Sequence, residues 1–128
     1  MIATKLFLMV LAHFWGDYML QPKKMAVKKS SSIAWCLLHC LIYTAVIVVA
    51  TATFKPLFII GVFVSHFIID YNEVGMKWLR IMGGRDFYEE FISTNEYREI
   101  HLSFATLIYA VVDNTLHVTI MTLLLLLS

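Results

Sequence analysis

Apolar residues divide the chain into four long segments separated by shorter polar stretches. The segments cover about residues 2–21, 33–54, 57–75 and 102–127. A membrane-spanning helix needs ~20 mostly apolar residues, so the first, second and fourth segments are long enough, and the third only if it includes polar residues. The pattern therefore predicts an all-α membrane protein, a four-transmembrane-helix bundle in a single transmembrane domain of residues 1–128.

The third and fourth segments are separated by the longest water-facing stretch, about residues 76–100. Apolar and acidic residues alternate there at roughly helical spacing: Phe87, Phe91 and Ile92 with Glu89, Glu90, Glu96 and Glu99. This spacing is typical of a short amphipathic helix on the membrane surface or over the mouth of the bundle. A solvated connector is the other interpretation.

Basic residues predict the orientation of the bundle. With four passes, loops 22–32 and 72–100 share one side, and the opposite side has only Lys5 and Lys55. The basic residues of the two loops are Lys23, Lys24, Lys28, Lys29, Lys77, Arg80, Arg85 and Arg98. The positive-inside rule then places these loops in the cytoplasm and both termini outside, in a multi-pass protein of the cell membrane.

The composition also indicates that the chain lies in a lipid bilayer rather than in water. The chain is 60% apolar and 15% charged, with a mean hydropathy of +0.77, whereas a soluble domain has about 25% charged residues. The formal net charge of +1 argues against nucleic acid as a partner, because binding it needs a basic excess. The expected partner is the lipid bilayer.

Three of the nine acidic residues lie inside the apolar segments, and each has a histidine four positions away. The pairs are His13 with Asp17, His66 with Asp70, and Asp113 with His117, and His39 adds a fourth imidazole. An ionisable group at the bilayer centre costs at least ~2.5–3.5 kcal/mol, so these acids need partners. Residues at i and i+4 share a helix face, which we expect to point inward.

The helical rise places these side chains at two neighbouring depths. Measured from the extracytoplasmic boundary, His13, His66 and His117 fall at about 14–16 Å. By the same rise Asp17, His39, Asp70 and Asp113 fall at about 20–22 Å. Imidazole and carboxylate form the mixed ligand set of zinc, manganese or iron. Because seven candidates exceed one tetrahedral site, we expect either two ions, or one ion with some of these residues orienting its ligands.

The residues also carry a resemblance to a known family. The stretches LAHFWGDYMLQ at 11–21, LLHCLIYT at 37–44, HFIIDY at 66–71 and DNTLH at 113–117 occur in this order. They resemble the signatures of a small bacterial and phage integral membrane family, domain of unknown function 3307. The last stretch departs from it, with Asp113-Asn114 where the family has Asp-Gln. The resemblance implies an inner-membrane helical fold and groups Gln21 with the histidines and acids, but it implies no reaction.

Our leading hypothesis is a metal-dependent hydrolase open to the cytoplasm, by loose similarity to membrane-bound metal-dependent hydrolases. A metal, most simply zinc, would activate water, with Asp17, Gln21 and Tyr43 as catalytic residues. An anionic lipid or phosphorylated substrate is an expected partner, steered by the lysines of residues 22–32. The unbroken leucines of residues 123–127 favour a sealed far face.

Other functions use the same residues. A carrier or channel could conduct metal ions or protons along the cluster, and a non-catalytic adaptor would need the histidines and acids only to fasten helices together. Haem would explain the histidines but not the acids. Self-association into a homo-oligomer fits the apolar surface, although no seam of small residues marks an interface.

Overall fold

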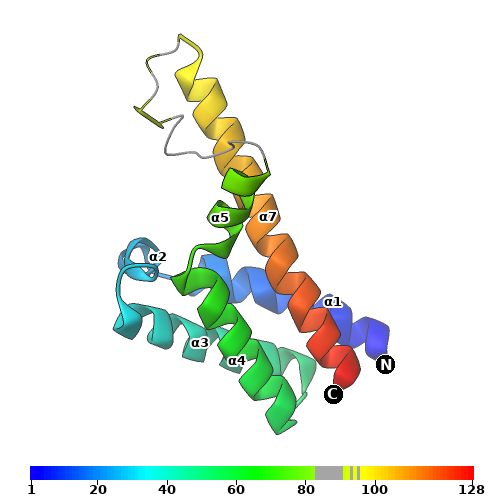
Figure 1. Ribbon diagram of the computed structural model, residues 1–128. Coiled ribbons are helices and arrows are strands. Elements are labelled where there is room, and N and C mark those ends of the chain that lie inside the picture. Colours follow the sequence, from blue (N-terminus) through cyan, green and yellow to red (C-terminus); the bar gives the residue numbers. More distant parts are fainter. Residues whose placement is uncertain (83–90, 93, 95) are drawn as a thin grey trace. The chain divides into compact units, whose positions relative to one another are not determined.

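Helices make up all the regular structure in the described part of the chain, as the prediction of an all-α fold requires (Figure 1). The computed structural model describes residues 1–82, 91, 92, 94 and 96–128. The chain divides into two compact units, residues 1–72 with 117–128, and residues 73–116. The long helix α7 (Arg98–Leu127) runs through both units.

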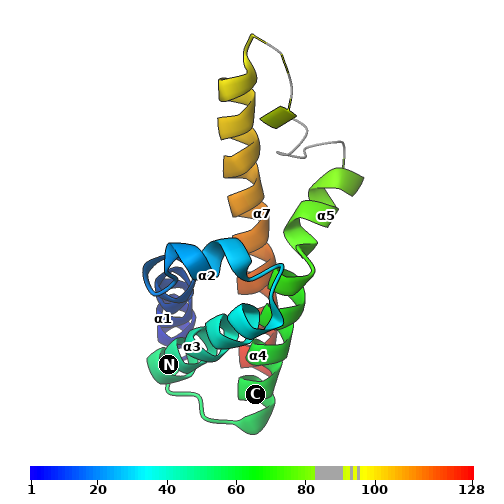
Figure 2. The same cartoon turned by 90° about the vertical axis from the view of Figure 1, so that its left-hand side faces the viewer.

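The first unit contains both termini and six helical segments. These are α1 (Ile2–Phe14), the π-helix η1 (Trp15–Met19), α2 (Lys23–Lys28), α3 (Ile33–Thr51), α4 (Pro56–Tyr71) and residues 117–127 of α7. Helix α3 contacts both α1 and α4, and the short α2 precedes it (Figures 1 and 2). Helix α3 therefore lies between α1 and α4.

Local conformation marks the end of α3 and the start of α4. Helix α3 contains no proline or glycine, the two residues least favourable inside a helix. It ends at Thr51, and the following residue, Ala52, adopts the left-handed conformation with φ 46°. Helix α4 starts at Pro56, a residue favoured at the first helical position because it lacks the N–H that would have no partner there.

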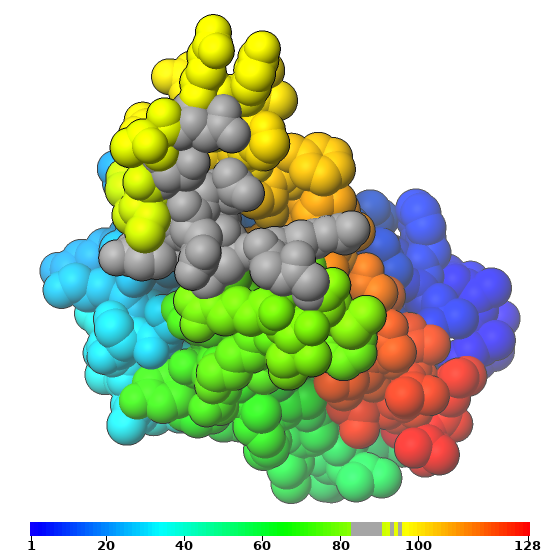
Figure 3. All heavy atoms as spheres, turned by 45° about the horizontal axis from the view of Figure 1, so that its top comes forward, coloured from blue at the N-terminus to red at the C-terminus, as the bar shows by residue number. Residues whose placement is uncertain are grey.

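A compact apolar core fills the interior of the first unit. Its buried members are Met9, Ala12, Tyr43, Ile47, Val48, Phe58, Val62, Met121 and Leu125. The end of α7 packs tightly on α4, because a Cβ at Gly61 would lie 2.6 Å from Cδ2 of Leu124. In Figure 3 the C-terminal end of α7 and the start of α4 meet without a gap between their side chains.

Two lysine contacts bring three parts of the first unit to one end. Lys5 Nζ donates to Thr53 Oγ1 at 2.9 Å. Lys55 Nζ donates to the main-chain oxygen of Ser128. The start of α1, the turn between α3 and α4 and the C-terminus therefore lie together, which is the arrangement expected of an up-and-down bundle.

The second unit consists of α5 (Val74–Ile81) and residues 98–116 of α7. A Cβ at Gly75 would lie 3.1 Å from Asp113 Oδ1 and 3.4 Å from the ring of Tyr109, so α5 approaches α7 closely at this glycine. The predicted surface helix of residues 76–100 depends on Phe87, Glu89 and Glu90, which lie outside the described residues.

Two described helices, α3 and α7, are long and apolar enough to span a membrane. A third span results if α4 and α5 form one broken span. Helix α1 has 13 residues and α4 has 16, fewer than the ~20 that a bilayer requires. The described residues therefore support a membrane protein, while the predicted four passes are not confirmed.

Candidate metal centre

Four buried side chains direct one polar atom each toward a common point in the first unit. Asp17 comes from η1, His39 from α3, and His66 and Asp70 from α4. His39 Nε2 lies 2.9 Å from His66 Nε2, 3.0 Å from Asp17 Oδ1 and 3.2 Å from Asp70 Oδ2. His66 Nε2 lies 3.3 Å from each of the same two carboxylate oxygens. These two nitrogens and two oxygens form the candidate metal centre.

Five of the six separations among these atoms, all those that involve a histidine nitrogen, are short enough for a tetrahedral coordination shell. In a regular tetrahedron the corner-to-centre distance is the edge divided by 1.63, so edges of 2.9–3.3 Å place a central ion about 1.8–2.0 Å from each atom, close to the ~2.0–2.2 Å of zinc bonds to nitrogen and oxygen. The four residues are at most 9% exposed. A buried set of two imidazoles and two carboxylates can hold one divalent ion.

Neutral imidazoles cannot place a proton in every one of these five close contacts. Each neutral imidazole carries one N–H, and an ionised carboxylate only accepts. His39 Nε2 lies within 3.2 Å of three polar atoms, but a single N–H points toward one of them. The facing nitrogens of His39 and His66 also compete for one proton or bring two protons together. A shared cation removes this conflict because all four atoms then act as ligands.

A π-helical turn positions Asp17. Leu20 N donates to Trp15 O at 2.9 Å, a bond that spans five residues rather than four. Single π-helical turns are frequent at functional sites. The turn brings Gly16 close to α3, where a Cβ would lie 2.7 Å from Cδ2 of Tyr43. Glycine therefore allows η1 to approach α3 closely enough for Asp17 to meet His39.

His117 lies on the other side of His66. The two Nδ1 atoms are 3.0 Å apart, and His117 Nε2 lies 3.2 Å from Asp70 Oδ1. Asp70 therefore uses one oxygen in the candidate metal centre and the other toward His117. Such contacts can fix the orientation of metal ligands, and both ring nitrogens of His117 lie within hydrogen-bond distance of these two residues. The assignment of His117 as a metal ligand stays a prediction.

His13 and Tyr43 form a second polar group beside Asp17. His13 Nδ1 lies 2.7 Å from the Tyr43 hydroxyl and 3.3 Å from Asp17 Oδ2. The Tyr43 hydroxyl donates to Met121 Sδ at 3.1 Å, and its ring stacks on His66 with centroids 3.6 Å apart. Tyr43 thus links His13 to a residue of the metal centre, and Asp17 is divided between the two groups.

Lys29 contacts the cluster, and its sequence position did not predict this contact. Its Nζ lies 2.7 Å from Asp70 Oδ2, with side chains 20% and 2% exposed. The sequence grouped it with the other lysines of residues 22–32, and no spacing separates it from them. It differs because α2 ends at Lys28 and the following turn carries Lys29 toward the end of α4.

Two predicted site residues, Gln21 and Asp113, supply none of the four atoms of the candidate metal centre. Gln21 is half-buried, and its Nε2 has no hydrogen-bond partner among the described residues. Asp113 is half-buried in the second unit, where it lies beside Gly75. The catalytic role of Gln21 and the metal-binding role of Asp113 therefore stay predictions.

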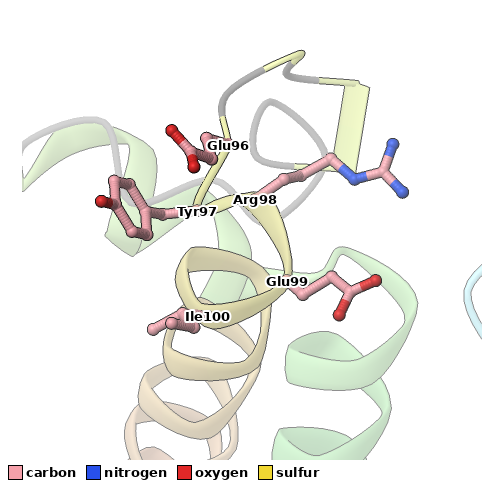
Figure 4. A pocket seen from close by; sticks show the side chains of 5 residues that line it. All are labelled: Glu96, Tyr97, Arg98, Glu99 and Ile100. Atoms are coloured by element: carbon pink, nitrogen blue, oxygen red, sulfur yellow. The ribbon is translucent and has the colours of Figure 1, made fainter.

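A surface hollow lies at the start of α7 in the second unit. Its volume is about 340 Å³, and five consecutive residues, Glu96, Tyr97, Arg98, Glu99 and Ile100, line it (Figure 4). Their side chains diverge from the helix end, with the two acids and the arginine pointing apart. None of the predicted site residues lines this hollow, and it contains no histidine, so it does not resemble a metal site.

Comparison with known proteins gave one match. The model of a family described as "Protein of unknown function (DUF3307)" matches residues 5–128. No curated protein and no solved structure matches the chain. The family description assigns no reaction, so the chemistry has to be inferred from the geometry of the buried cluster.

Proposed function

The protein belongs to the DUF3307 family, and we propose that it is a membrane-embedded, metal-dependent hydrolase. The observation that carries the proposal is the convergence of one polar atom each from Asp17, His39, His66 and Asp70 in a buried site. One divalent ion, most simply zinc, would be held by these residues, and catalysis would require a further coordination position for water or substrate beside them. The ion would supply Lewis acidity, to polarise a carbonyl or phosphoryl oxygen and to lower the pKa of water toward ~7.

The chain's own residues would handle the proton. His13 has Nδ1 within hydrogen-bond distance of the Tyr43 hydroxyl and near the outer oxygen of Asp17. A histidine next to an ionised carboxylate is a suitable general base near neutral pH. We therefore assign the proton to His13, with Tyr43 fixing its ring. Asp17, which the sequence assigned both to catalysis and to metal binding, is better used as a ligand because Oδ1 faces His39 and His66.

The proposed topology has four passes, with loops 22–32 and 72–100 in the cytoplasm and both termini outside. Two observations support it. The contacts of Lys5 with Thr53 and of Lys55 with Ser128 bring the termini and the α3–α4 turn to one end. Lys29, from the loop before α3, reaches Asp70 near the end of α4, so that loop lies at the opposite end of α4.

A carrier or channel is less well supported than an enzyme open on one side. A conduit needs polar groups that continue to the far face. Between the cluster and the end that holds the termini, the core residues Ile47, Phe58, Val62, Met121 and Leu125 are buried and apolar. The buried threonines at that end, Thr51 and Thr53, donate to main-chain oxygens. This core favours a site that exchanges water and substrate with the loop side alone. Absence of metal or proton flux in liposomes is the result expected.

Metal content is the experiment that tests the proposal. Purified protein should contain about one zinc, manganese or iron equivalent per chain, as four ligands imply. His39→Ala and Asp70→Asn should lose it, while His101→Ala, which alters an exposed histidine of α7, should keep it. X-ray absorption should find two nitrogens and two oxygens about 2.0 Å from the ion.

Hydrolysis is tested with the same protein. Chromogenic carboxylic and phosphate esters should be turned over by the loaded protein, and a chelator should abolish the turnover in parallel with the metal. Protein that is folded and active without metal would contradict the proposal. If the His39→Ala and Asp70→Asn proteins kept full function, the adaptor hypothesis would replace it.

A further inference from the structure

Lys29 introduces a positive charge at the edge of the candidate metal centre. Its ammonium contacts Asp70 Oδ2, which is itself one of the four proposed ligand atoms, at 2.7 Å. Because that oxygen would lie ~2 Å from the ion, the ammonium lies no more than about 4.7 Å from the ion's position. One anionic group with two oxygens could contact both the ion and the ammonium.

The Lys29 ammonium would repel a bound ion. Both carry positive charge, and the ammonium lies no more than about 4.7 Å from the ion's position. Charges this close interact strongly where water screens them only in part. An anion that contacts both relieves this repulsion, so the site should favour substrates that carry negative charge at the reacting group.

Lys29 also stands at the boundary between the cluster and the surface. Its side chain is 20% exposed, whereas that of Asp70 is 2% exposed. The preceding helix α2 presents Lys23, Lys24 and Lys28 to the surface, and Val27 is 69% exposed beside them. Basic and apolar residues on one short helix are typical of a segment at an anionic membrane surface.

We infer that Lys29 is the anion-binding residue of the site and that the substrate is a phosphate ester, one of whose oxygens contacts the Lys29 ammonium while another faces the metal centre. The inference rests on the proposed metal-dependent function and specifies its substrate class. A phospholipid headgroup and a water-soluble phosphate ester share this chemistry. Lysine suits it as a compact phosphate-binding charge.

The experiment measures metal and anion binding separately. Protein in phosphatidylcholine nanodiscs is loaded with Co²⁺, whose visible absorption reports both its binding and changes in its ligands, and is then titrated with inorganic phosphate. The variants are Lys29→Met, Lys29→Arg and Lys28→Met. Lys28 is the matched control because it is the adjacent lysine and is exposed.

In Lys29→Met we expect the affinity for phosphate to fall and the affinity for Co²⁺ not to fall. Phosphate affinity should fall about 10- to 100-fold, the value of a hydrogen bond to a charged group. Co²⁺ affinity should stay equal or rise, because removal of the ammonium relieves its repulsion of the ion. Lys29→Arg should retain phosphate binding, and Lys28→Met should match the wild type in both affinities.

Three results would overturn the inference. Equal phosphate affinity in the wild type and Lys29→Met, with Co²⁺ bound in both, rejects the role of Lys29 and leaves the metal proposal intact. Loss of both Co²⁺ and phosphate in Lys29→Met and Lys29→Arg indicates a purely structural lysine. Failure of the wild type to bind Co²⁺ rejects the proposed function together with the inference.

A second set of nanodiscs distinguishes the two sources of the phosphate group. If the substrate is a lipid, phosphatidylglycerol in place of part of the phosphatidylcholine should compete with inorganic phosphate in the wild type and less in Lys29→Met. Phosphate binding that depends on Lys29 but is unchanged by phosphatidylglycerol supports a water-soluble phosphate ester. Both outcomes support the anion site.

Discussion

Gly16→Ala should damage the metal centre through Tyr43. The added Cβ would lie 2.7 Å from Tyr43 Cδ2 and 3.3 Å from Cε2, whereas carbon atoms pack at ~3.5–4.0 Å. The tyrosine ring would have to move by about 1 Å, and a close-packed interior has no space for that shift. Tyr43 is fully buried and its ring stacks on His66, so the displacement should be passed to a proposed ligand.

Two magnitudes follow from this geometry. Overpacking of a buried site costs ~1–3 kcal/mol in the free energy of unfolding. Disturbing the residues that orient metal ligands costs about 10- to 100-fold in metal affinity. Gly16→Ala should therefore lower both stability and affinity, although residue 16 itself contributes no ligand atom.

Gly61→Ala supplies a matched control for Gly16→Ala. Its Cβ would lie 2.6 Å from Leu124 Cδ2, an equally short contact, but with the flexible end of an aliphatic side chain rather than with a ring that stacks on a proposed ligand. Stability is measured by denaturant titration in mixed micelles, and zinc affinity by competition with a chromophoric chelator. Gly61→Ala should lose at most stability. Wild-type zinc affinity in a destabilised Gly16→Ala protein would refute the reasoning.

Two further substitutions test local features of the first unit. Tyr43→Phe removes the hydroxyl that contacts His13 and Met121. It should lower the free energy of unfolding by ~0.5–1.5 kcal/mol and leave the metal content, measured by elemental analysis, unchanged. A loss of metal would show that the hydroxyl is part of the metal site. Ala52→Gly relieves the left-handed backbone at φ 46°; it should stabilise the protein by about 0.5–1 kcal/mol in the same denaturant titration, and a loss of stability would contradict that account.

The helical fold was predictable because its signal is local. Apolar runs long enough to form spanning helices give the all-helical class, and Pro56 marks the start of α4. The resemblance carried by four short stretches is confirmed by a family match over residues 5–128. The number of membrane passes is harder to derive, because α1 gives way to the π-helix after Phe14 and α4 ends at Tyr71.

The candidate metal centre was predictable in kind. Charged residues are too costly in an apolar segment to occur without a role, and a four-residue spacing puts His66 and Asp70 on one helix face. Their 3.3 Å separation agrees with this. The roles within the cluster depend on the packing of helices, which sequence spacing does not describe. The contact of Lys29 with Asp70 and the division of Asp17 between two partners both depend on this packing.

Sequence alone determined the solvent, the helices and the residue types that a buried site would use, since all three depend on local hydropathy and periodicity. The tertiary structure decided which atoms meet. It brought two imidazole nitrogens and two carboxylate oxygens within reach of one another, placed His13 against Tyr43 and His117 against His66, and brought Lys29 to Asp70. Coordination and charge balance act over distances of a few ångströms, and only the packing of separate helices sets those distances.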